Sequence, residues 1–175
     1  MNNTVRKTDK DQNEIKTLIV YYSLSGNTKG IAQNIQKILG ADIAEIEPLV
    51  PYTGSYDDIV EQGKDEVDNQ IRPAIKSLKS KIADYRRIII GTPTWWYTMA
   101  PVVSTFLYSN KWEGKIVVPF MTNAGWPGTV IKDMKDACKG AIFSDEKEIR
   151  FHASDQRRMI TSQKEVTEWI MRMKL

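Results

Sequence analysis

The sequence predicts a single α/β domain built on a doubly wound, five-stranded parallel sheet with helices on both faces. Two observations indicate this fold. Short apolar runs alternate with helical patterns along the chain, and polar or aromatic loops follow three of these runs directly. Alternating strands and helices favour right-handed crossovers, and ligands of such sheets bind at the carboxyl ends of the strands. The three loops are therefore the candidate binding site.

The composition suits one globular domain and excludes several classes of protein. The chain has 175 residues, 41% of them hydrophobic and 27% charged, which allows a substantial core. The longest apolar runs, at residues 17–22 and 116–121, are too short to cross a bilayer as helices, so no membrane span is predicted. The net charge of +3 is spread along the chain, which argues against a nucleic-acid groove.

The termini and the single cysteine bear on domain limits and location. Residues 1–15 are polar and lack the apolar core of a signal peptide, so we expect a flexible polar leader followed by one domain over residues 16–175. Cys138 is the only cysteine, which excludes an intramolecular disulfide and a thiol-based zinc cluster. A cytoplasmic location is expected on this basis, with a processed exported protein as the alternative.

The first half of the chain contains two predicted strands. Residues 16–22 are a nearly continuous apolar run, as in a central strand covered on both faces. The polar loop 23–28 follows and leads into a helical pattern with one apolar face. Residues 42–47 predict a second, peripheral strand. The charged stretch 54–79 predicts a surface helical connection that Pro73 interrupts or starts.

The second half repeats the same unit. A buried strand at residues 87–91 is followed by the loop 92–97 and by a helix from about residue 101 to 109. A fourth strand at residues 115–121 is followed by the loop 122–128 and by a helix that ends near Cys138.

The last predicted elements are a weak fifth strand at residues 148–152 and a final helix at residues 162–173, whose apolar residues recur at helical spacing. Neither a second core nor an internal domain boundary is evident in the sequence.

The loop after the first strand has the composition of a phosphate cradle. Its residues are Ser23, Leu24, Ser25, Gly26, Asn27 and Thr28. Backbone N–H groups at a helix start, together with the helix dipole, favour an anion, and the hydroxyls add directed donors. The loop has neither the lysine of a P-loop nor a GxGxxG pattern, so a terminal monophosphate fits best. Taken alone, the loop is equally well explained as an ordinary helix cap.

The second loop supports a ligand more strongly. Trp95, Trp96 and Tyr97 lie consecutively just past a strand end, where a protein has little structural use for three aromatic side chains. They suit stacking on a flat ring, with at least one of the two tryptophans packed inward. The third loop offers backbone donors and acceptors for a ring's carbonyls and nitrogens at Thr122, Asn123, Ala124 and Gly125.

These loops resemble the flavodoxin family, and more closely the flavodoxin-like proteins whose first loop reads S-x-S-G-N-T and whose second contains P-x-W-W. The resemblance covers about residues 16–175 and implies the sheet order 2-1-3-4-5. It implies non-covalently bound FMN, with the phosphate held by the first loop and the isoalloxazine between the other two. On one side of the ring it places Pro93, Thr94, Trp95, Trp96 and Tyr97, and on the other residues 122–125.

The sequence departs from acidic electron-shuttling flavodoxins in three respects. It is mildly basic, so the usual acidic docking surface is not evident. Residues 92–99 contain no glycine, whereas many flavodoxins place one beside the flavin N5, so one-electron chemistry is less favoured. Residues 92–104 contain no Asp or Glu, from which we expect a less negative flavin potential.

The sequence is consistent with three functions, one leading and two alternative. The leading one is electron transfer through bound FMN, with a redox partner protein or a small acceptor such as a quinone, and with the flavin supplying the chemistry. The first alternative is an FMN-dependent NAD(P)H:quinone-type oxidoreductase, which the missing loop glycine favours. The second is a non-redox phospho-ligand or receiver-type module, which the lack of carboxylates at the strand ends disfavours.

No catalytic side chain or metal ligand is predicted. His152 and Cys138 are expected to be structural or exposed, since neither has a partner motif in the sequence. Tyr52 and Tyr56 can reach over the site or cover the sheet edge, and they are not assigned to the site.

Overall fold

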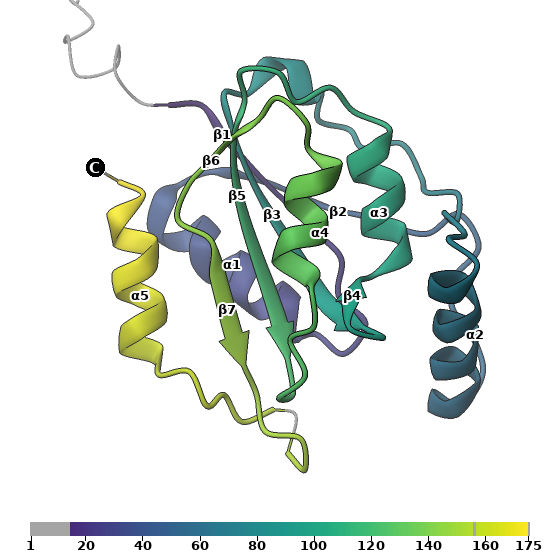
Figure 1. Cartoon of the computed structure of the whole chain (residues 1–175). Coiled ribbons are helices and arrows are strands. Elements are labelled where there is room, and N and C mark those ends of the chain that lie inside the picture. Colours follow the sequence, from purple (N-terminus) through teal and green to yellow (C-terminus); the bar gives the residue numbers. More distant parts are fainter. Residues whose placement is uncertain (1–14, 156, 175) are drawn as a thin grey trace, which may run out of the picture.

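The computed structural model describes residues 15–155 and 157–174 (Figure 1). The predicted leader lies outside the described residues, except for its last residue, Ile15. Strands and helices alternate through most of the chain. In order they are β1 (Thr17–Tyr21), α1 (Asn27–Leu39), β2 (Asp42–Glu45), α2 (Tyr56–Asp68), the 3-10 helix η2 (Ile82–Asp84), β3 (Arg87–Trp95), β4 (Thr98–Met99), α3 (Pro101–Tyr108), β5 (Ile116–Asn123), α4 (Val130–Ala137), β6 (Ile142–Phe143), β7 (Lys147–Arg150) and α5 (Gln163–Arg172).

The sheet has the predicted parallel core. Its order is β2-β1-β3-β5-β6, and every neighbouring pair along this path is parallel. The flavodoxin-like order 2-1-3-4-5 is confirmed, with the fifth position divided between β6 and β7, which both pair with β5. The chain leaves the sheet between them, where Asp145 has a φ of 50°. With β4, which pairs with β3, the sheet has seven strands rather than the predicted five.

Two hydrophobic clusters pack on opposite faces of the sheet. Helices α1 and α5 cover one face, where Ile35 and Trp169 are fully buried. Helices α3 and α4 cover the other face, where Leu107 and Met134 are buried. Both faces of the central strands are thus covered, which explains why these strands read as continuous apolar runs rather than alternating ones.

The connection between β2 and β3 is helical only in its first half. Helix α2 starts at a capping box in which the Ser55 hydroxyl accepts from the Asp58 N–H and the Asp58 carboxylate accepts from the Ser55 N–H. It ends at Asp68, and residues 69–79 are irregular. The predicted helical connection over residues 54–79 is wrong there, because Pro73 has no N–H to continue a helix and Ile75 forms an isolated bridge with Pro48.

The strands before the second and third loops are longer than predicted. Strand β3 continues to Trp95 and returns as β4, so the predicted loop 92–97 is largely an antiparallel hairpin. Strand β5 likewise continues to Asn123, because β7 pairs with its last four residues. Extra backbone pairing explains both differences, since β3 pairs with β5 and with the adjacent β4, and β5 pairs with β7. Within the described residues, no helix combines the length and apolarity needed to cross a membrane.

Candidate functional site

The three predicted loops meet at the carboxyl edge of the sheet and enclose a cavity of about 150 Å³. Nine of the predicted residues line it, together with Tyr56 and Phe151, which the sequence analysis did not assign to the site. The predicted lining residues are Leu24, Ser25, Asn27, Pro93, Thr94, Trp95, Thr122, Asn123 and Ala124. The other predicted residues, Ser23, Gly26, Thr28, Trp96, Tyr97 and Gly125, do not line this cavity.

The first loop presents the start of α1 to this edge. Gly26 precedes the helix with a φ of 95°, and no side chain among the described residues caps the helix there. A Cβ added to Gly26 would meet nothing within 4 Å, so the loop is open to an approaching group. The Ser23 hydroxyl accepts from the Gly26 N–H at 3.1 Å and shapes the turn. An uncapped, open helix start of this kind suits a phosphate.

Thr28 links the first loop to the third. Its side chain is buried, and its Oγ1 lies 2.8 Å from Oγ1 of Thr122 in a hydrogen bond between α1 and β5. The Thr28 hydroxyl is therefore engaged within the protein. The hydrogen bond holds the first loop and the third loop at a set distance from each other.

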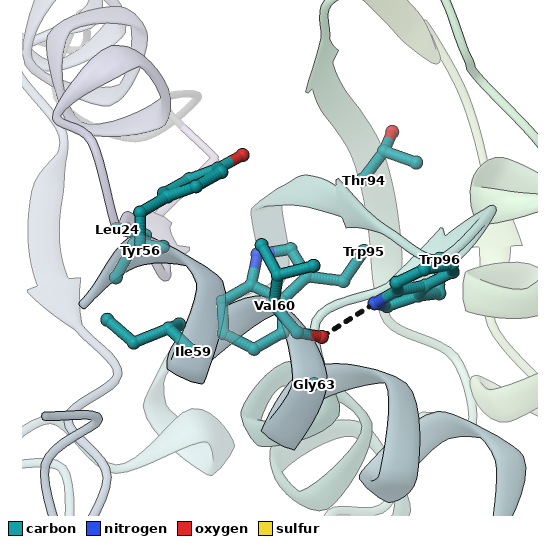
Figure 2. A pocket seen from close by; sticks show the side chains of 8 residues that line it. All are labelled: Leu24, Tyr56, Ile59, Val60, Gly63, Thr94, Trp95 and Trp96. Carbon is teal, nitrogen blue, oxygen red and sulfur yellow. Dashed lines mark hydrogen bonds between the residues drawn. The ribbon is translucent and has the colours of Figure 1, made fainter. Parts of the chain in front are cut away.

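The second loop separates the roles of its two tryptophans. Trp95 is buried, with its ring centroid 4.9 Å from that of Tyr52 and 5.8 Å from that of Tyr22. Trp96 is 40% exposed, and its Nε1 donates to the Val60 carbonyl at 2.9 Å (Figure 2). Trp95 is the inward-packed residue, and it alone of the two lines the cavity between the three loops.

Helix α2 contributes a glycine that sequence analysis missed. A Cβ on Gly63 would lie 2.9 Å from Cε3 of Trp95, so only glycine lets the indole pack this closely against the helix. Glycine in a helix interior costs about 0.5–1 kcal/mol relative to alanine. From the local sequence, Gly63 predicts only a less stable helix. The glycine is explained by its contact with Trp95, which lies 32 residues further along the chain.

The hairpin tip has an unusual backbone. Trp96 and Tyr97 form the two-residue turn between β3 and β4, with φ values of 47° and 67°. Such turns favour Asn-Gly because both central residues need positive φ, and bulky residues are rare in this region. The turn is held from outside, since the Thr129 N–H donates to the Tyr97 carbonyl at 2.8 Å and Gly128 packs directly against the Tyr97 backbone.

The third loop is shaped by side chains that also serve the fold. The Asn123 side-chain oxygen accepts from the Gly125 N–H at 2.7 Å, and its amide donates to Glu148 at 3.0 Å. A Cβ on Gly125 would come within 3.0 Å of Nη2 of Arg150, so the glycine leaves room for a guanidinium beside this loop. Arg150 was not predicted to be near the site, because its place depends on the pairing of β7 with β5.

The cavity between the loops has no charged side chain in its lining and one buried hydroxyl without a hydrogen-bond partner. Its lining residues include no Lys, Arg, Asp or Glu. The Thr94 Oγ1 is buried and has no hydrogen-bond partner among the described residues. An unpaired buried hydroxyl costs about 1–3 kcal/mol, and a ring carbonyl or nitrogen would satisfy it. These features fit an uncharged flat ring with its anionic end at the start of α1.

The described residues form no cluster of side chains that could bind a metal ion. Within residues 15–155 and 157–174, no group of three or more His, Cys, Asp or Glu side chains is placed to hold a metal ion. Burial raises the pKa of the Cys138 thiol to about 12, and the residue lies away from the lining of the cavity.

Comparison with known proteins agrees with this geometry. A family model described as Flavodoxin matches residues 16–173. A search of curated proteins found no significant match. Among solved structures, a candidate flavoprotein from Bacteroides eggerthii is 28% identical with a TM-score of 0.72, the alignment covering 93% of this chain and 99% of that one.

Two further solved structures have the same fold. A candidate flavoprotein from Bacteroides uniformis is 26% identical with a TM-score of 0.74, and the alignment covers 89% of this chain and 97% of that one. A flavoprotein from Lactobacillus acidophilus in complex with FMN is 24% identical with a TM-score of 0.64, and the alignment covers 74% and 90%. The last likeness is to the fold alone.

Proposed function

This chain belongs to the flavodoxin family, and on that premise we propose that it binds FMN non-covalently between its three loops and transfers electrons through it. The observation that carries the proposal is the neutral cavity with the unpaired Thr94 hydroxyl, next to the uncapped start of α1. The Lactobacillus relative in complex with FMN supports the choice of cofactor.

Each loop has a separate task in this proposal. Backbone N–H groups at the start of α1 bind the phosphate, with Ser25 as the exposed hydroxyl of the loop. Trp95 and Thr94 contact the isoalloxazine from the hairpin, and the backbone at residues 122–125 reads its polar edge. Bound FMN supplies the redox chemistry, and the protein supplies binding, orientation and exclusion of water. A redox protein or a small molecule is the partner.

A two-electron NAD(P)H:quinone-type oxidoreductase is the second candidate function. The hairpin tip favours it, because the Trp96 indole is hydrogen-bonded to Val60 and the Tyr97 carbonyl to Thr129. A turn held at both residues resists a peptide rearrangement that would follow one-electron reduction. The electron donor distinguishes the two functions: NAD(P)H would reduce the oxidoreductase directly, and a partner reductase would reduce the electron carrier.

The first test is FMN binding with a Thr94→Val variant. Purified protein should quench the fluorescence of added FMN and keep its flavin bands through desalting. Replacing Thr94 by Val removes the unpaired hydroxyl, so FMN affinity should fall about fivefold or more while apoprotein stability stays level or rises. Absence of quenching by the wild-type protein would refute the proposal.

A matched control uses Thr105→Val in α3. The Thr105 hydroxyl donates to the Pro73 carbonyl at 2.8 Å, so this variant should lose about 1 kcal/mol of stability and keep its FMN affinity. Thr94→Val should therefore lower FMN affinity without lowering stability, and Thr105→Val should lower stability without lowering FMN affinity.

A separate experiment distinguishes the two candidate functions. For the FMN-loaded protein, rapid bleaching by NADPH or NADH with turnover on a quinone indicates the reductase, and reduction only through a partner reductase indicates the electron carrier.

A further inference from the structure

A separate cavity lies where α2, α3 and α4 come together beside β4 (Figure 1). Its volume is about 360 Å³, in the ~300–1,000 Å³ range of small-molecule sites. None of its lining residues lines the cavity between the three loops. We call this space the α2–α4 cavity. Its ligand is therefore a separate question from the proposed binding of FMN.

The lining of the α2–α4 cavity is acidic. It carries the carboxylates of Glu66, Asp133 and Asp136 and, as its one cationic side chain among the described residues, Arg72. Asp136 is paired with Lys132 at 2.6 Å. Neither Glu66 nor Asp133 forms an ion pair within the part of the chain that the structure describes. Two carboxylates at the cavity therefore have no counter-charge.

Glu66 is the buried member of this set. It is 6% exposed, and its oxygens accept from the Tyr52 hydroxyl at 2.7 Å and from the Gln62 side-chain amide at 2.8 Å. Burial, together with the hydrogen bond and charge of Glu66, raises the pKa of Tyr52, so both donors are neutral. A buried carboxylate is costly unless a cation pairs with it. A positively charged ligand would lower that cost.

The backbone of α2 adds to the negative potential at Glu66. This residue lies in the last turn of α2, which ends at Asp68 and contains no basic residue. The C-terminal end of a helix carries roughly half a negative charge from its unpaired carbonyl groups. This contribution is independent of the carboxylates, and it favours a cation at the same end of the cavity.

The arrangement favours an elongated organic cation over a metal ion. Within residues 15–155 and 157–174, no three Asp, Glu, His or Cys side chains are placed to hold one metal ion. Glu66 comes from α2 and Asp133 from α4. Apolar surface in the lining comes from Val67, Met99 and Pro101. A ligand with a positive charge at each end and methylene groups between them matches both features.

The lining already holds one cation against an aromatic ring. The Arg72 guanidinium lies 3.6 Å from the centroid of the Tyr108 ring in a cation–π contact. Both residues are exposed, so water weakens this contact. The positive charge of Arg72 opposes a cationic ligand, and its removal should strengthen binding.

We propose that the α2–α4 cavity binds an aliphatic diamine, with one ammonium group donating to Glu66 and the other to Asp133. The ammonium groups supply the two missing counter-charges, and the methylene groups pack against the apolar lining. Oδ2 of Asp133 already accepts from the Thr98 and Thr129 hydroxyls at 2.6 Å each. No described residue donates to its Oδ1, which is the oxygen that receives the ligand.

The test is calorimetry on the full-length protein with three ligands that share the butane chain. 1,4-Diaminobutane should bind with a Kd of about 1 mM or lower, and its affinity should fall as salt is raised. Butylamine, with a single ammonium group, should bind at least tenfold more weakly. 1,4-Butanediol, which is uncharged, should give no measurable heat. Absence of diamine binding, or equal binding of the diol, would overturn the proposal.

Four variants locate the binding on the α2–α4 cavity. Glu66→Gln keeps the shape and removes the charge, so diamine affinity should fall about tenfold or more. Asp133→Asn should weaken it severalfold, and Arg72→Gln should strengthen it about two- to fivefold. Glu61→Gln removes the same charge at an exposed position of α2 outside the lining. It is the matched control and should bind the diamine as the wild-type protein does.

The variants also give the results that refute the proposal. Equal diamine affinity in the wild-type protein and Glu66→Gln would overturn it, and so would an equal loss in Glu61→Gln, which indicates attraction to net charge alone. Urea denaturation checks the fold of Glu66→Gln. If that variant is unfolded, Asp133→Asn and Arg72→Gln decide, and unchanged affinity in both overturns the proposal. Failure of the wild-type protein to bind FMN would refute only the proposed function.

Discussion

Gly128 joins the third loop to the hairpin tip, and its replacement tests how the site is assembled. A Cβ at Gly128 would lie 1.9 Å from the carbonyl oxygen and 2.5 Å from the Cα of Tyr97. Both atoms belong to the backbone, so no side-chain rotation relieves the contact. We expect Gly128→Ala to push the hairpin away from the third loop and to disturb the side of the site formed by Trp95.

The size of the effect has two parts. Gly128 has a φ of 56°, a conformation that costs an L-residue about 1–2 kcal/mol. Relieving the overlap with Tyr97 adds about 1–3 kcal/mol, as for other overpacked sites. Gly114 has a φ of 72° and open space where a Cβ would be, so Gly114→Ala carries the first cost alone and is the matched control.

The assay combines stability with cofactor binding. Urea denaturation of the apoproteins should show Gly128→Ala about 1–3 kcal/mol less stable than Gly114→Ala. FMN titration should show at least a tenfold loss of affinity, about 1.4 kcal/mol, in Gly128→Ala only. If the two variants agree within about 0.5 kcal/mol and bind FMN alike, the third loop does not hold the hairpin and the reasoning fails.

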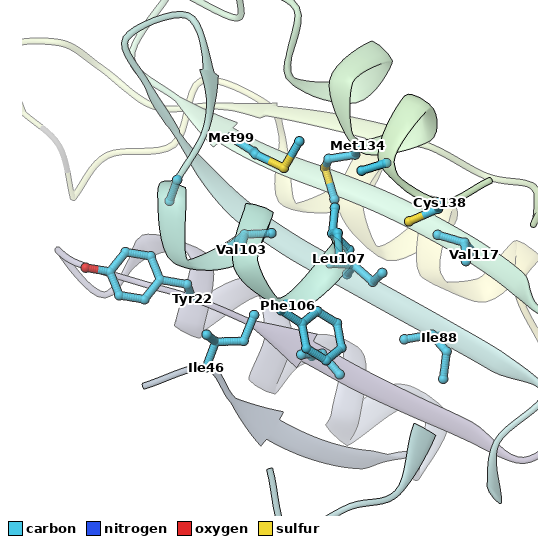
Figure 3. Close-up of a cluster of buried hydrophobic side chains, with 14 of the residues drawn as sticks. Tyr22, Ile46, Ile88, Met99, Val103, Phe106, Leu107, Val117, Met134 and Cys138 are labelled. Carbon is cyan, nitrogen blue, oxygen red and sulfur yellow. The ribbon is translucent and has the colours of Figure 1, made fainter. Parts of the chain in front are cut away.

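Three further predictions follow from single residues. Burial raises the pKa of the Cys138 thiol, drawn within its apolar cluster in Figure 3, to about 12. The native thiol should therefore resist disulfide reagents at pH 8, and stability should fall as pH rises toward 12 because only the unfolded thiol ionises; full labelling of native protein would contradict this. Arg150→Gln should make the FMN potential more negative by on the order of 10–20 mV, and Arg86→Gln at the opposite sheet edge should not; equal shifts in a redox titration would exclude a local effect. Tyr97→Gly should raise the free energy of unfolding by about 0.5–1 kcal/mol, because glycine accepts positive φ, and a loss of stability in urea would count against strain at this turn.

The β3–β4 hairpin is only partly predictable from the sequence. Trp95 and Trp96 were both predicted at the site, and their environments turned out to be opposite. Trp95 is buried because Gly63 of α2 leaves room for it, and Trp96 is at the surface because the turn reverses the chain there. Neither cause is visible in the local pattern of residues 92–97, since one depends on a distant helix and the other on pairing with β4.

Local signals predicted the alternation of the main strands and helices and the turn that leads into α1. Apolar runs, helical periodicity and the hydroxyl-rich turn at residues 23–28 are properties of neighbouring residues, so sequence alone predicts the α/β class and a phosphate-type loop. The packing of Gly63 against Trp95, the Thr28–Thr122 link and the place of Arg150 join segments far apart in the chain. Only the tertiary structure decides these, because packing and strand register bring such segments together and no local periodicity encodes them.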